Sequence, residues 1–261
     1  MTTNLYLIGT PIGNLSDISK RAIDTLNNVH TVVAEDTRVT KKLLSHYDIN
    51  KPIMSFNSKN YKSKIASIQK LLKNYDIGLT TDAGTPGISD PGYELITSVE
   101  SLDVNIIPIP GPSALTSAIS VSGFPINQFY FAGFAPRRET ELRTFLDSIE
   151  KLNVPIIMFE SPNRIKKLLE LLIKYAHHKN VLIMREMTKI YEERFYGSLQ
   201  DALSNFQNPK GEITLILEPS GLSIQSFTDK EIFELINKFK SDGLGTKSIA
   251  QELSSIFACG L

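Results

Sequence analysis

The most informative part of this chain is the stretch Thr-Asp-Ala-Gly-Thr-Pro-Gly-Ile-Ser-Asp-Pro-Gly-Tyr at residues 81–93. It directly follows the strand-like run Ile77–Thr80, and its last residue, Tyr93, begins a helix-like run. Open α/β sheets bind ligands in loops of this kind, at the carboxyl ends of their strands. The stretch therefore predicts a ligand site at one edge of a sheet.

Two further loops share this design. Residues 9–14 (Gly-Thr-Pro-Ile-Gly-Asn) follow the first strand-like run, and residues 108–113 (Pro-Ile-Pro-Gly-Pro-Ser) follow a later one. The first of these lacks both common phosphate-binding glycine patterns, and Pro11 removes an amide that a phosphate would use. Taken alone it is a tight turn, but three such loops at one sheet edge indicate a pocket for a small molecule held by main-chain groups.

The first half of the chain alternates short apolar runs with amphipathic ones. Strands are predicted at residues 5–8, 31–34, 52–56, 77–80 and 104–107. Helices are predicted between them: one over residues 18–29 capped by Asp17, others over 37–47, 65–72 and 113–121, and one begun by Asp90 and Pro91. This alternation predicts a mostly parallel sheet covered by helices.

The second half follows a break in the pattern at residues 122–127. Strands are predicted at residues 130–133, 155–160, 181–184, 193–196 and 212–217, with helices at 138–152, 163–176 and 199–206. Because the strand connections differ in length, we expect this sheet to be mixed. The predicted domains are residues 1–121 and 122–219, followed by a short helical extension over 220–261. Residues 219–227 are the predicted linker, and helices are predicted at 229–240 and 246–257.

The composition of the chain limits which classes of function it can have. The formal net charge of the 261 residues is +0, so no global basic field attracts nucleic acid, and an RNA substrate would need local patches or shape recognition. The single cysteine, Cys259, excludes an intrachain disulfide and fits a cytoplasmic protein. No run approaches the length of a membrane span, and the histidines, including His177 and His178 at a predicted helix end, lack metal-ligand spacing. We expect neither a membrane segment nor a metal.

Polar residues follow several predicted strands. Asp36 either caps the next helix or, with Glu35 and Arg38, orients a substrate. The two roles are compatible if Asp36 is the cap while Glu35 and Arg38 face the cleft. Asp82 is the first polar side chain with an ionisable group after a buried strand, which suits a base or a ligand contact. The second half repeats this theme in Phe159–Arg164 and in Arg185–Lys189.

Basic residues in these loops offer phosphate contacts, although solvated charges on exposed faces are commoner than nucleic-acid sites. The candidates for RNA binding are Arg38, Arg137, Arg164, Arg185 and Lys189.

Several segments together resemble a known family. Leu5–Ile18, Ala34–Arg38 and Asp82–Tyr93 closely resemble the bacterial ribosomal RNA small subunit methyltransferase I family, within the tetrapyrrole methylase superfamily. The match continues, in order and between about residues 4 and 218, through Pro110–Ser113, Phe131–Pro136, Glu160–Arg164, Arg185–Lys189 and Gly211–Glu212. The resemblance weakens after residue 219, where this family usually carries a small helical domain that helps to hold RNA.

The resemblance implies a two-domain α/β tetrapyrrole methylase-like fold, a homodimer, and S-adenosylmethionine bound between the domains. It implies 2′-O-methylation of a cytidine in the decoding region of 16S ribosomal RNA, on the assembled small subunit. The donor contacts that it implies are Thr10, Pro11, Gly13, Asp82, Ala83, Gly84, Thr85, Pro86, Gly111, Pro112, Ser113, Phe159, Glu160, Ser161, Gly211 and Glu212.

Three carboxylates are candidates for the group that activates or orients the ribose hydroxyl: Asp82, Glu35 and Glu186. The sequence does not rank them. Two other functions stay open, a methylase of a tetrapyrrole or another small acceptor and a ribosome-associated binding factor without catalysis. The segments Glu35–Arg38 and Arg185–Lys189 argue against the first of these.

Overall fold

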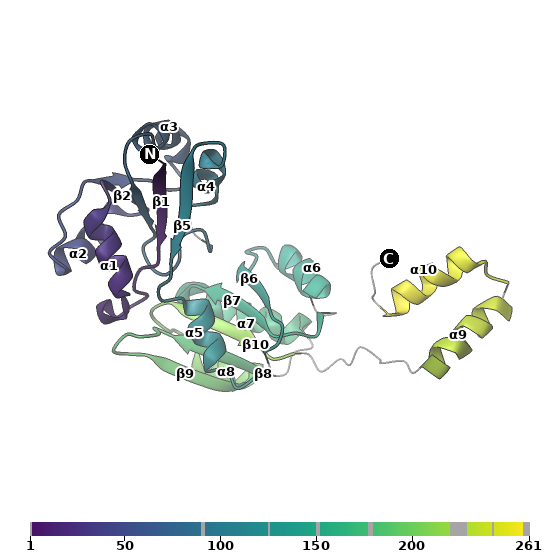
Figure 1. Ribbon diagram of the computed structural model, residues 1–261. Helices are drawn as coiled ribbons and strands as arrows, with labels where there is room; N and C mark the ends of the chain where they lie inside the picture. The colour runs from purple at the N-terminus through teal and green to yellow at the C-terminus, as the bar shows by residue number, and fades with distance from the viewer. Residues whose placement is uncertain are drawn as a thin grey trace.

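The computed structural model describes residues 2–89, 92–124, 126–149, 152–176, 180–219, 229–241 and 243–257. The predicted roles of Asp90, Pro91, His177, His178 and Cys259, and all of the predicted linker except Pro219, lie outside these residues. Within them, two five-stranded sheets form separate units, one above the other in Figure 1, and a pair of helices stands to one side.

The first sheet is entirely parallel, with the strand order β3-β2-β4-β1-β5. Every residue of β2 and β4 is buried, as expected for strands covered on both faces. Neighbouring side chains alternate between the faces, so Leu5 joins one hydrophobic cluster and Ile8 the other. The strands are β1 (Thr3–Ile8), β2 (Thr31–Ala34), β3 (Ile53–Ser55), β4 (Ile77–Thr80) and β5 (Val104–Ile109).

Two helices cover each face of this sheet. Helices α1 (Lys20–Asn28) and α2 (Thr37–His46) pack on the face of Ile8, and α3 (Tyr61–Leu72) and α4 (Tyr93–Val99) pack on the face of Leu5. This arrangement confirms the predicted parallel α/β unit.

The cap predicted for α1 is wrong. Asp17 ends a short 3-10 turn, η1 (Leu15–Asp17), and Ile18 after it has extended backbone angles. The helix begins two residues later, because Ser19 caps it by accepting a hydrogen bond from the Ala22 amide. The apolar spacing located the helix correctly, but it did not distinguish two neighbouring residues that both suit an N-cap.

The second sheet is mixed, which confirms the prediction from its connections. Its order is β6-β7-β10-β8-β9, and only the pair β6–β7 is parallel. The strands are β6 (Tyr130–Phe134), β7 (Ile156–Glu160), β8 (Asn180–Arg185), β9 (Glu193–Ser198) and β10 (Ile213–Leu217). Helices α6 (Glu139–Ile149), α7 (Pro162–Tyr175) and α8 (Leu199–Asn205) cover one face with the largest apolar cluster.

The other face of the second sheet meets the first unit. Helix α5 (Ala114–Ser120) packs there through the buried Ala118, and Ile12 from the loop after β1 joins the same cluster. Although we predicted a boundary after residue 121, α5 packs on the second sheet. We therefore propose that the first domain ends ahead of α5, near residue 113.

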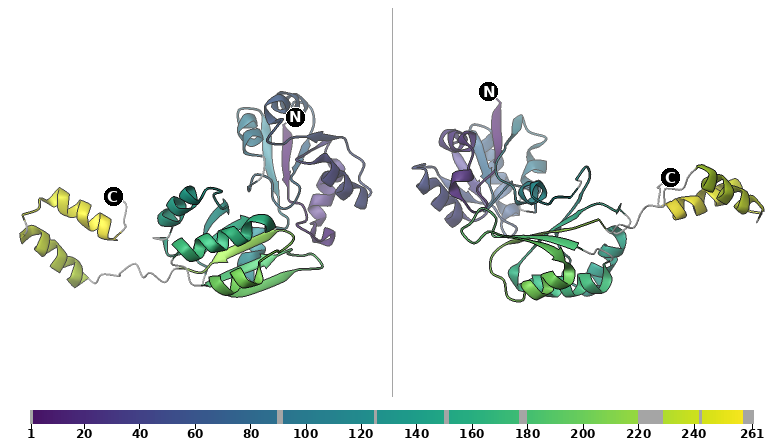
Figure 2. Two further views of the ribbon diagram at one scale, coloured as in Figure 1. Left: turned by 180° about the vertical axis from the view of Figure 1, so that it is seen from behind. Right: turned by 90° about the horizontal axis from the view of Figure 1, so that it is seen from below.

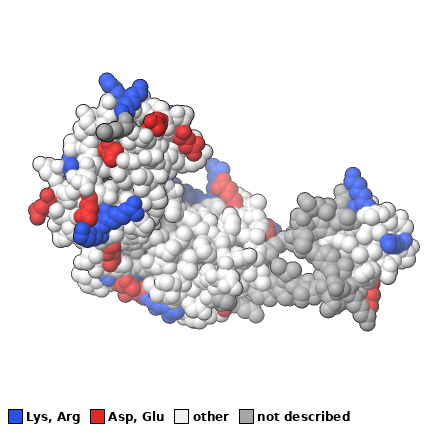
Figure 3. Space-filling view, in the orientation of Figure 1, with Lys and Arg blue, Asp and Glu red and all other residues white. Residues whose placement is uncertain are grey.

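The extension consists of helices α9 (Asp229–Ser241) and α10 (Thr246–Phe257), which stand apart from both sheets in every view of Figures 1 and 2. Acidic and basic side chains are interspersed over the visible face of the first unit (Figure 3), so no single-sign field is evident there. Within the described residues, no helix is both long and apolar enough to cross a membrane.

Candidate functional site between the two domains

The site lies at the carboxyl edge of the parallel sheet, where the loops after β1, β2 and β4 meet. Two backbone hydrogen bonds pair the first and third loops: the Thr10 amide donates to the Gly84 carbonyl at 2.9 Å, and the Gly84 amide donates to the Thr10 carbonyl at 3.1 Å. Gly84 has a φ of +84°, which a side chain would strain. The Thr10 hydroxyl adds a bond to the Thr81 carbonyl at 3.2 Å. These contacts hold the two loops as one rigid wall.

Two cavities adjoin this wall. The first, of about 410 Å³, opens between the two domains and is called the interdomain cavity. The second, of about 380 Å³, opens beside helix α2 and is called the α2 cavity. Both are large enough for a small ligand. They share four residues at their common boundary: Ile12, Asp82, Ala83 and Glu212.

The interdomain cavity is suited to a cation. Its aromatic and apolar side chains include Phe134, Phe159 and Ile88, and its acidic ones include Glu35 and Glu160. Among the described residues that line it, none is lysine or arginine. Carboxylates attract a positive centre directly, and aromatic faces do so through their quadrupole.

Glu160 is the most deeply buried acid of this cavity. Its side chain is fully covered, and burial raises the pKa of its carboxyl even though Ser161 and two nearby arginines, Arg164 and Arg137, act to lower it. The Ser161 amide donates to Glu160 Oε1 at 2.7 Å, and Arg164 Nη2 lies 3.2 Å from Oε2. Arg164 also donates to the Ala135 carbonyl at 2.7 Å. The carboxylate is thus fixed in place at the end of β7.

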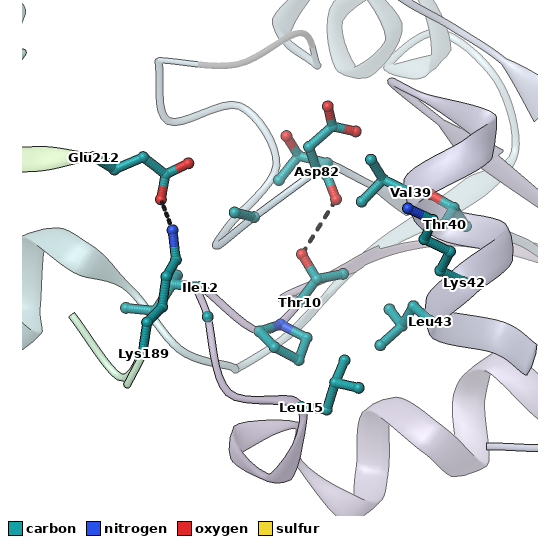
Figure 4. A pocket seen from close by; sticks show the side chains of 14 residues that line it. Thr10, Ile12, Leu15, Val39, Thr40, Lys42, Leu43, Asp82, Lys189 and Glu212 are labelled. Carbon is teal, nitrogen blue, oxygen red and sulfur yellow. Dashed lines mark hydrogen bonds and ion pairs between the residues drawn. The ribbon is translucent and has the colours of Figure 1, made fainter. Parts of the chain in front are cut away.

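The α2 cavity has an apolar side and a charged side. Leu15, Val39 and Leu43 form the apolar side, with Lys42 beside them, and Lys189 and Glu212 approach from the second domain (Figure 4). Val39, Lys42 and Leu43 are three and four residues apart, so they share one face of α2.

Asp82 stands where the two cavities meet. Its Oδ1 accepts a hydrogen bond from the Asp36 amide at 3.0 Å, which orients the carboxylate. Partial burial raises the pKa of Asp82, and the negative charges of Glu35 and Asp36 raise it further. The neighbouring Glu35 accepts a hydrogen bond from the Thr81 hydroxyl at 2.7 Å and faces the interdomain cavity.

Glu186, the third candidate carboxylate, is occupied by structural contacts. Its Oε1 accepts hydrogen bonds from Lys189 Nζ at 2.8 Å and from the Glu212 amide at 2.9 Å. The bond from Lys189 lowers the pKa of Glu186, so this carboxyl is a weaker proton acceptor than Asp82. Lys189 also contacts Glu212 Oε2 at 3.0 Å. The geometry favours Glu186 as a support for the loops around it.

The predicted donor contacts divide into three groups. Those that line the interdomain cavity are Asp82, Ala83, Gly84, Thr85, Ser113, Phe159, Glu160, Ser161 and Glu212. Thr10, Pro11 and Gly13 line the α2 cavity instead. Pro86, Gly111, Pro112 and Gly211 line neither cavity.

The predicted RNA-binding residues are also placed differently from one another. Arg38 does not face the cleft with Glu35, because it turns back to Asp36 in a two-pronged ion pair whose closest contact is 2.5 Å. Arg164 is tied to Glu160, and Arg185 Nε donates to Glu193 at 2.7 Å. Arg137 is exposed. These pairings leave less free positive charge around the site than the sequence suggested.

Several lining residues were missed by sequence reasoning. The interdomain cavity includes Phe134 and Thr214, and the α2 cavity includes the helical residues Val39, Lys42 and Leu43. The helical set carried a usable signal, since it forms one face directly after the Glu35–Arg38 segment. Phe134 carried none, because its approach depends on how the two domains meet.

Comparison with known proteins identifies the family of this chain. The profile of the family described as Tetrapyrrole (Corrin/Porphyrin) Methylases matches residues 4–203. The chain belongs to the tetrapyrrole methylase family. Within it, similar proteins are named ribosomal RNA small subunit methyltransferase I. One from Thermotoga maritima is 47% identical over 82% of this chain and 97% of its own, and one from Synechocystis is 35% identical over 96% and 91%.

Solved structures show the same tetrapyrrole methylase fold. A cobalt precorrin-4 methyltransferase of cobalamin biosynthesis has a TM-score of 0.60 at 17% identity, covering 82% of this chain and 94% of its own. A putative diphthine synthase from Entamoeba histolytica has a TM-score of 0.61 at 17% identity, with coverages of 89% and 97%.

Members of this methylase family use S-adenosylmethionine, and this chain is a methyltransferase that depends on it. The interdomain cavity fits that donor, because its sulfonium and amino groups are cationic and the cavity offers carboxylates and aromatic rings without a lysine or arginine among its described lining residues. No group of three potential metal ligands comes together in the part of the chain that the structure describes.

Proposed function

We propose that this protein methylates the ribose 2′-hydroxyl of a cytidine in the decoding region of 16S ribosomal RNA, on the assembled small subunit. The names of its relatives and the sequence resemblance support the substrate. The observation that carries the chemistry is the position of Asp82, whose carboxylate belongs to the walls of both cavities.

In this proposal the interdomain cavity holds the donor and the α2 cavity receives the target nucleoside. When bound, S-adenosylmethionine supplies an electrophilic methyl group on its sulfonium. Glu35, Glu160 and Glu212 stabilise the positive charge of the bound donor. Leu15, Val39 and Leu43 cover the faces of the nucleoside, and the common wall brings its ribose toward the donor side.

Asp82 orients the 2′-hydroxyl and accepts its proton. Its raised pKa makes the ionised carboxylate a stronger proton acceptor than an ordinary aspartate. The bond from the Asp36 amide holds Oδ1 and thereby restricts the orientation of the carboxylate at the boundary of the two cavities. Asp36 also caps α2. One residue therefore positions both the base, Asp82, and the helix that lines the acceptor side.

Methyl transfer to purified small subunits tests the proposal. With labelled S-adenosylmethionine, the Asp82→Ala variant should lose at least about 100-fold in kcat/KM, the lower range for a general base. The Asp24→Ala variant, which removes an exposed acid of α1 paired with Lys20, is the control and should retain full activity. Unchanged turnover in Asp82→Ala would remove Asp82 from the mechanism.

Product analysis separates this function from its alternatives. Nuclease digestion and mass spectrometry should show methylation on the ribose of cytidine. Transfer to a porphyrin precursor in place of subunits would indicate a small-molecule methylase. Binding of the donor by calorimetry, without transfer to subunits or to naked RNA, would indicate a binding factor.

We also propose that the protein is a homodimer. Light scattering after size-exclusion chromatography tests this, and a monomeric mass across a range of concentrations would contradict it.

A further inference from the structure

The tip of the β8–β9 hairpin exposes two large apolar side chains. Ile190 is 94% exposed and Tyr191 is 74% exposed. Single exposed apolar residues are common on proteins, but two adjacent ones beside a functional cavity are not explained by chance alone.

This tip is held rigidly. The Thr188 amide donates to Glu192 at 2.5 Å, and the Glu192 amide donates to the Lys189 carbonyl at 3.1 Å. Glu186 and Thr188 both have positive φ angles, 51° and 68°, which persist only where surrounding contacts enforce them. The exposure of Ile190 and Tyr191 is therefore fixed by the fold.

The first domain anchors the same tip. The Asn14 amide donates to the Thr188 hydroxyl at 3.0 Å. Gly13 lies so close that an added Cβ would stand 2.5 Å from Lys189 Cγ. These contacts thus fix the position of the tip relative to the loop that lines the α2 cavity.

Neighbouring residues of the tip reach two different hollows. Lys189 lines the α2 cavity, whereas Tyr191 lines a separate open groove of about 550 Å³. This groove, called the Tyr191 groove, is lined by Arg185, Tyr191, Glu193, Asn205, Phe206, Gln207, Asn208, Pro209 and Lys210.

The chemistry of the Tyr191 groove suits a nucleotide. It combines one exposed aromatic ring with exposed side-chain amides and with the exposed cation Lys210. The amides of Asn205 and Gln207 donate to Glu193 and to the Leu203 carbonyl, so their oxygens and the Asn208 amide face a ligand. The acid of the groove, Glu193, is paired with Arg185. Aromatic rings stack on any base, amides recognise base edges, and lysine contacts phosphate. A protein partner would instead favour a mainly apolar core, and the apolar Phe206 here is buried.

We infer that the Tyr191 groove binds a nucleotide of the RNA adjacent to the one that enters the α2 cavity, with its base stacked on Tyr191 and its phosphate near Lys210. This inference rests on the proposed function in its choice of RNA. It adds a second subsite, one that keeps the neighbouring nucleotide outside the α2 cavity.

Direct RNA binding tests the groove independently of catalysis. A fluorescent single-stranded cytidine-rich RNA of about ten nucleotides, within the range of single-strand binding sites, serves as the probe in anisotropy titrations. Tyr191→Ala should weaken binding roughly 5- to 100-fold, as expected for loss of one stacked base, and Tyr191→Phe should change it less than about twofold. Tyr75→Ala removes a half-exposed tyrosine that stacks on His30 at the opposite end of the first sheet, and should have no effect.

Kinetics provide the second measurement. Tyr191→Ala should raise KM for small subunits with little change in kcat, because the groove acts on binding. Unchanged RNA affinity and unchanged KM in Tyr191→Ala would overturn the inference, as would a change in oligomeric mass, which would make this tip a protein interface. Weaker RNA binding by Tyr191→Ala, in a protein that fails to methylate subunits, would support the groove and refute the proposed function.

Discussion

Replacing Gly13 with alanine should disturb the contact that fixes the two domains around the site. Gly13 carries no unusual φ angle, so its role is steric. An added Cβ would lie 2.5 Å from Lys189 Cγ, 2.7 Å from Thr188 Oγ1 and 2.9 Å from the Met187 carbonyl oxygen. Carbon atoms pack best at about 3.5–4.0 Å, so the hairpin tip must move by roughly 1 Å.

The size of this effect follows from the surroundings. Forcing a methyl group into a packed contact costs about 1–3 kcal/mol. The displaced Lys189 ion pairs add little, because Lys189 and Glu186 are partly exposed and Glu212 is 73% exposed at its side chain. For a protein of this size, each kcal/mol lowers Tm by about 2–4 °C.

Calorimetric unfolding and donor binding measure the outcome together. Gly13→Ala should lower Tm and weaken S-adenosylmethionine binding, because Ile12 beside it lines the interdomain cavity. The control is Gly245→Ala, where no atom lies within 4 Å of the added Cβ and the φ angle is ordinary. It should leave donor binding unchanged, and any change in Tm should come only from the start of α10, which Gly245 directly precedes.

A double-mutant cycle makes the prediction specific. In a Lys189→Ala background the clash with Cγ disappears, so Gly13→Ala should cost less there than in the wild type. The coupling should exceed the roughly 0.3–0.5 kcal/mol within which independent sites add. Additive effects, or a Gly13→Ala variant as stable as the wild type, would refute the proposed role of this contact.

Two further predictions concern the helices that carry the site. Ser19→Ala should destabilise the protein by about 1 kcal/mol because it removes the cap of α1, whereas Asp17→Ala should stay within about 0.5 kcal/mol of the wild type. Urea unfolding measures both free energies of unfolding. A larger loss in Asp17→Ala than in Ser19→Ala would show that Asp17 is the cap. The pKa of Asp36 is lowered to about 2 by hydrogen bonds from Arg38, so its contribution to stability is complete above about pH 4 and is lost as the pH falls toward 2. Thermal unfolding at a series of pH values measures this loss, and Tm should fall less steeply between about pH 4 and about pH 2 in Asp36→Asn than in the wild type. The same fall in both proteins would show that other groups cause the acid sensitivity.

The parallel half of the fold was predictable because its strands are short, mostly apolar and separated by helical patterns. Thr31–Ala34 and Ile77–Thr80 were located to the residue, since strands buried on both faces read as nearly continuous runs of apolar or small residues. Strand ends were less certain where pairing extends past the apolar run. Strand β5, for example, continues through Pro108 and Ile109 on the edge of its sheet, where a proline is tolerated.

The site was predictable where it depends on loops of the first domain and unpredictable where the domains meet. The small residues that follow β4 led to the prediction that residues 82–85 line a pocket, and they do line the interdomain cavity. The sequence did not show which charged residues pair with each other. Arg164, in the first turn of α7, meets Glu160 at the end of β7, and Lys189 in the β8–β9 loop meets Glu212 just before β10. A cluster of basic letters in a sequence cannot show which of them are neutralised by carboxylates in the fold.

The division into two cavities also suggests where substrate choice resides. The cobalt precorrin-4 methyltransferase shares this fold at only 17% identity, and its name gives a different acceptor. Residues of both domains line the interdomain cavity, which is suited to a donor cation. Any methylase that uses this donor must bind such a cation. The α2 cavity instead depends on Val39, Lys42 and Leu43 from one helix and on a hairpin tip pressed against Gly13. We therefore expect exchange of the helical residues Val39, Lys42 and Leu43, which line the α2 cavity alone, to change the acceptor while donor binding persists. Loss of donor binding in such exchanges would show that the two cavities are not separable.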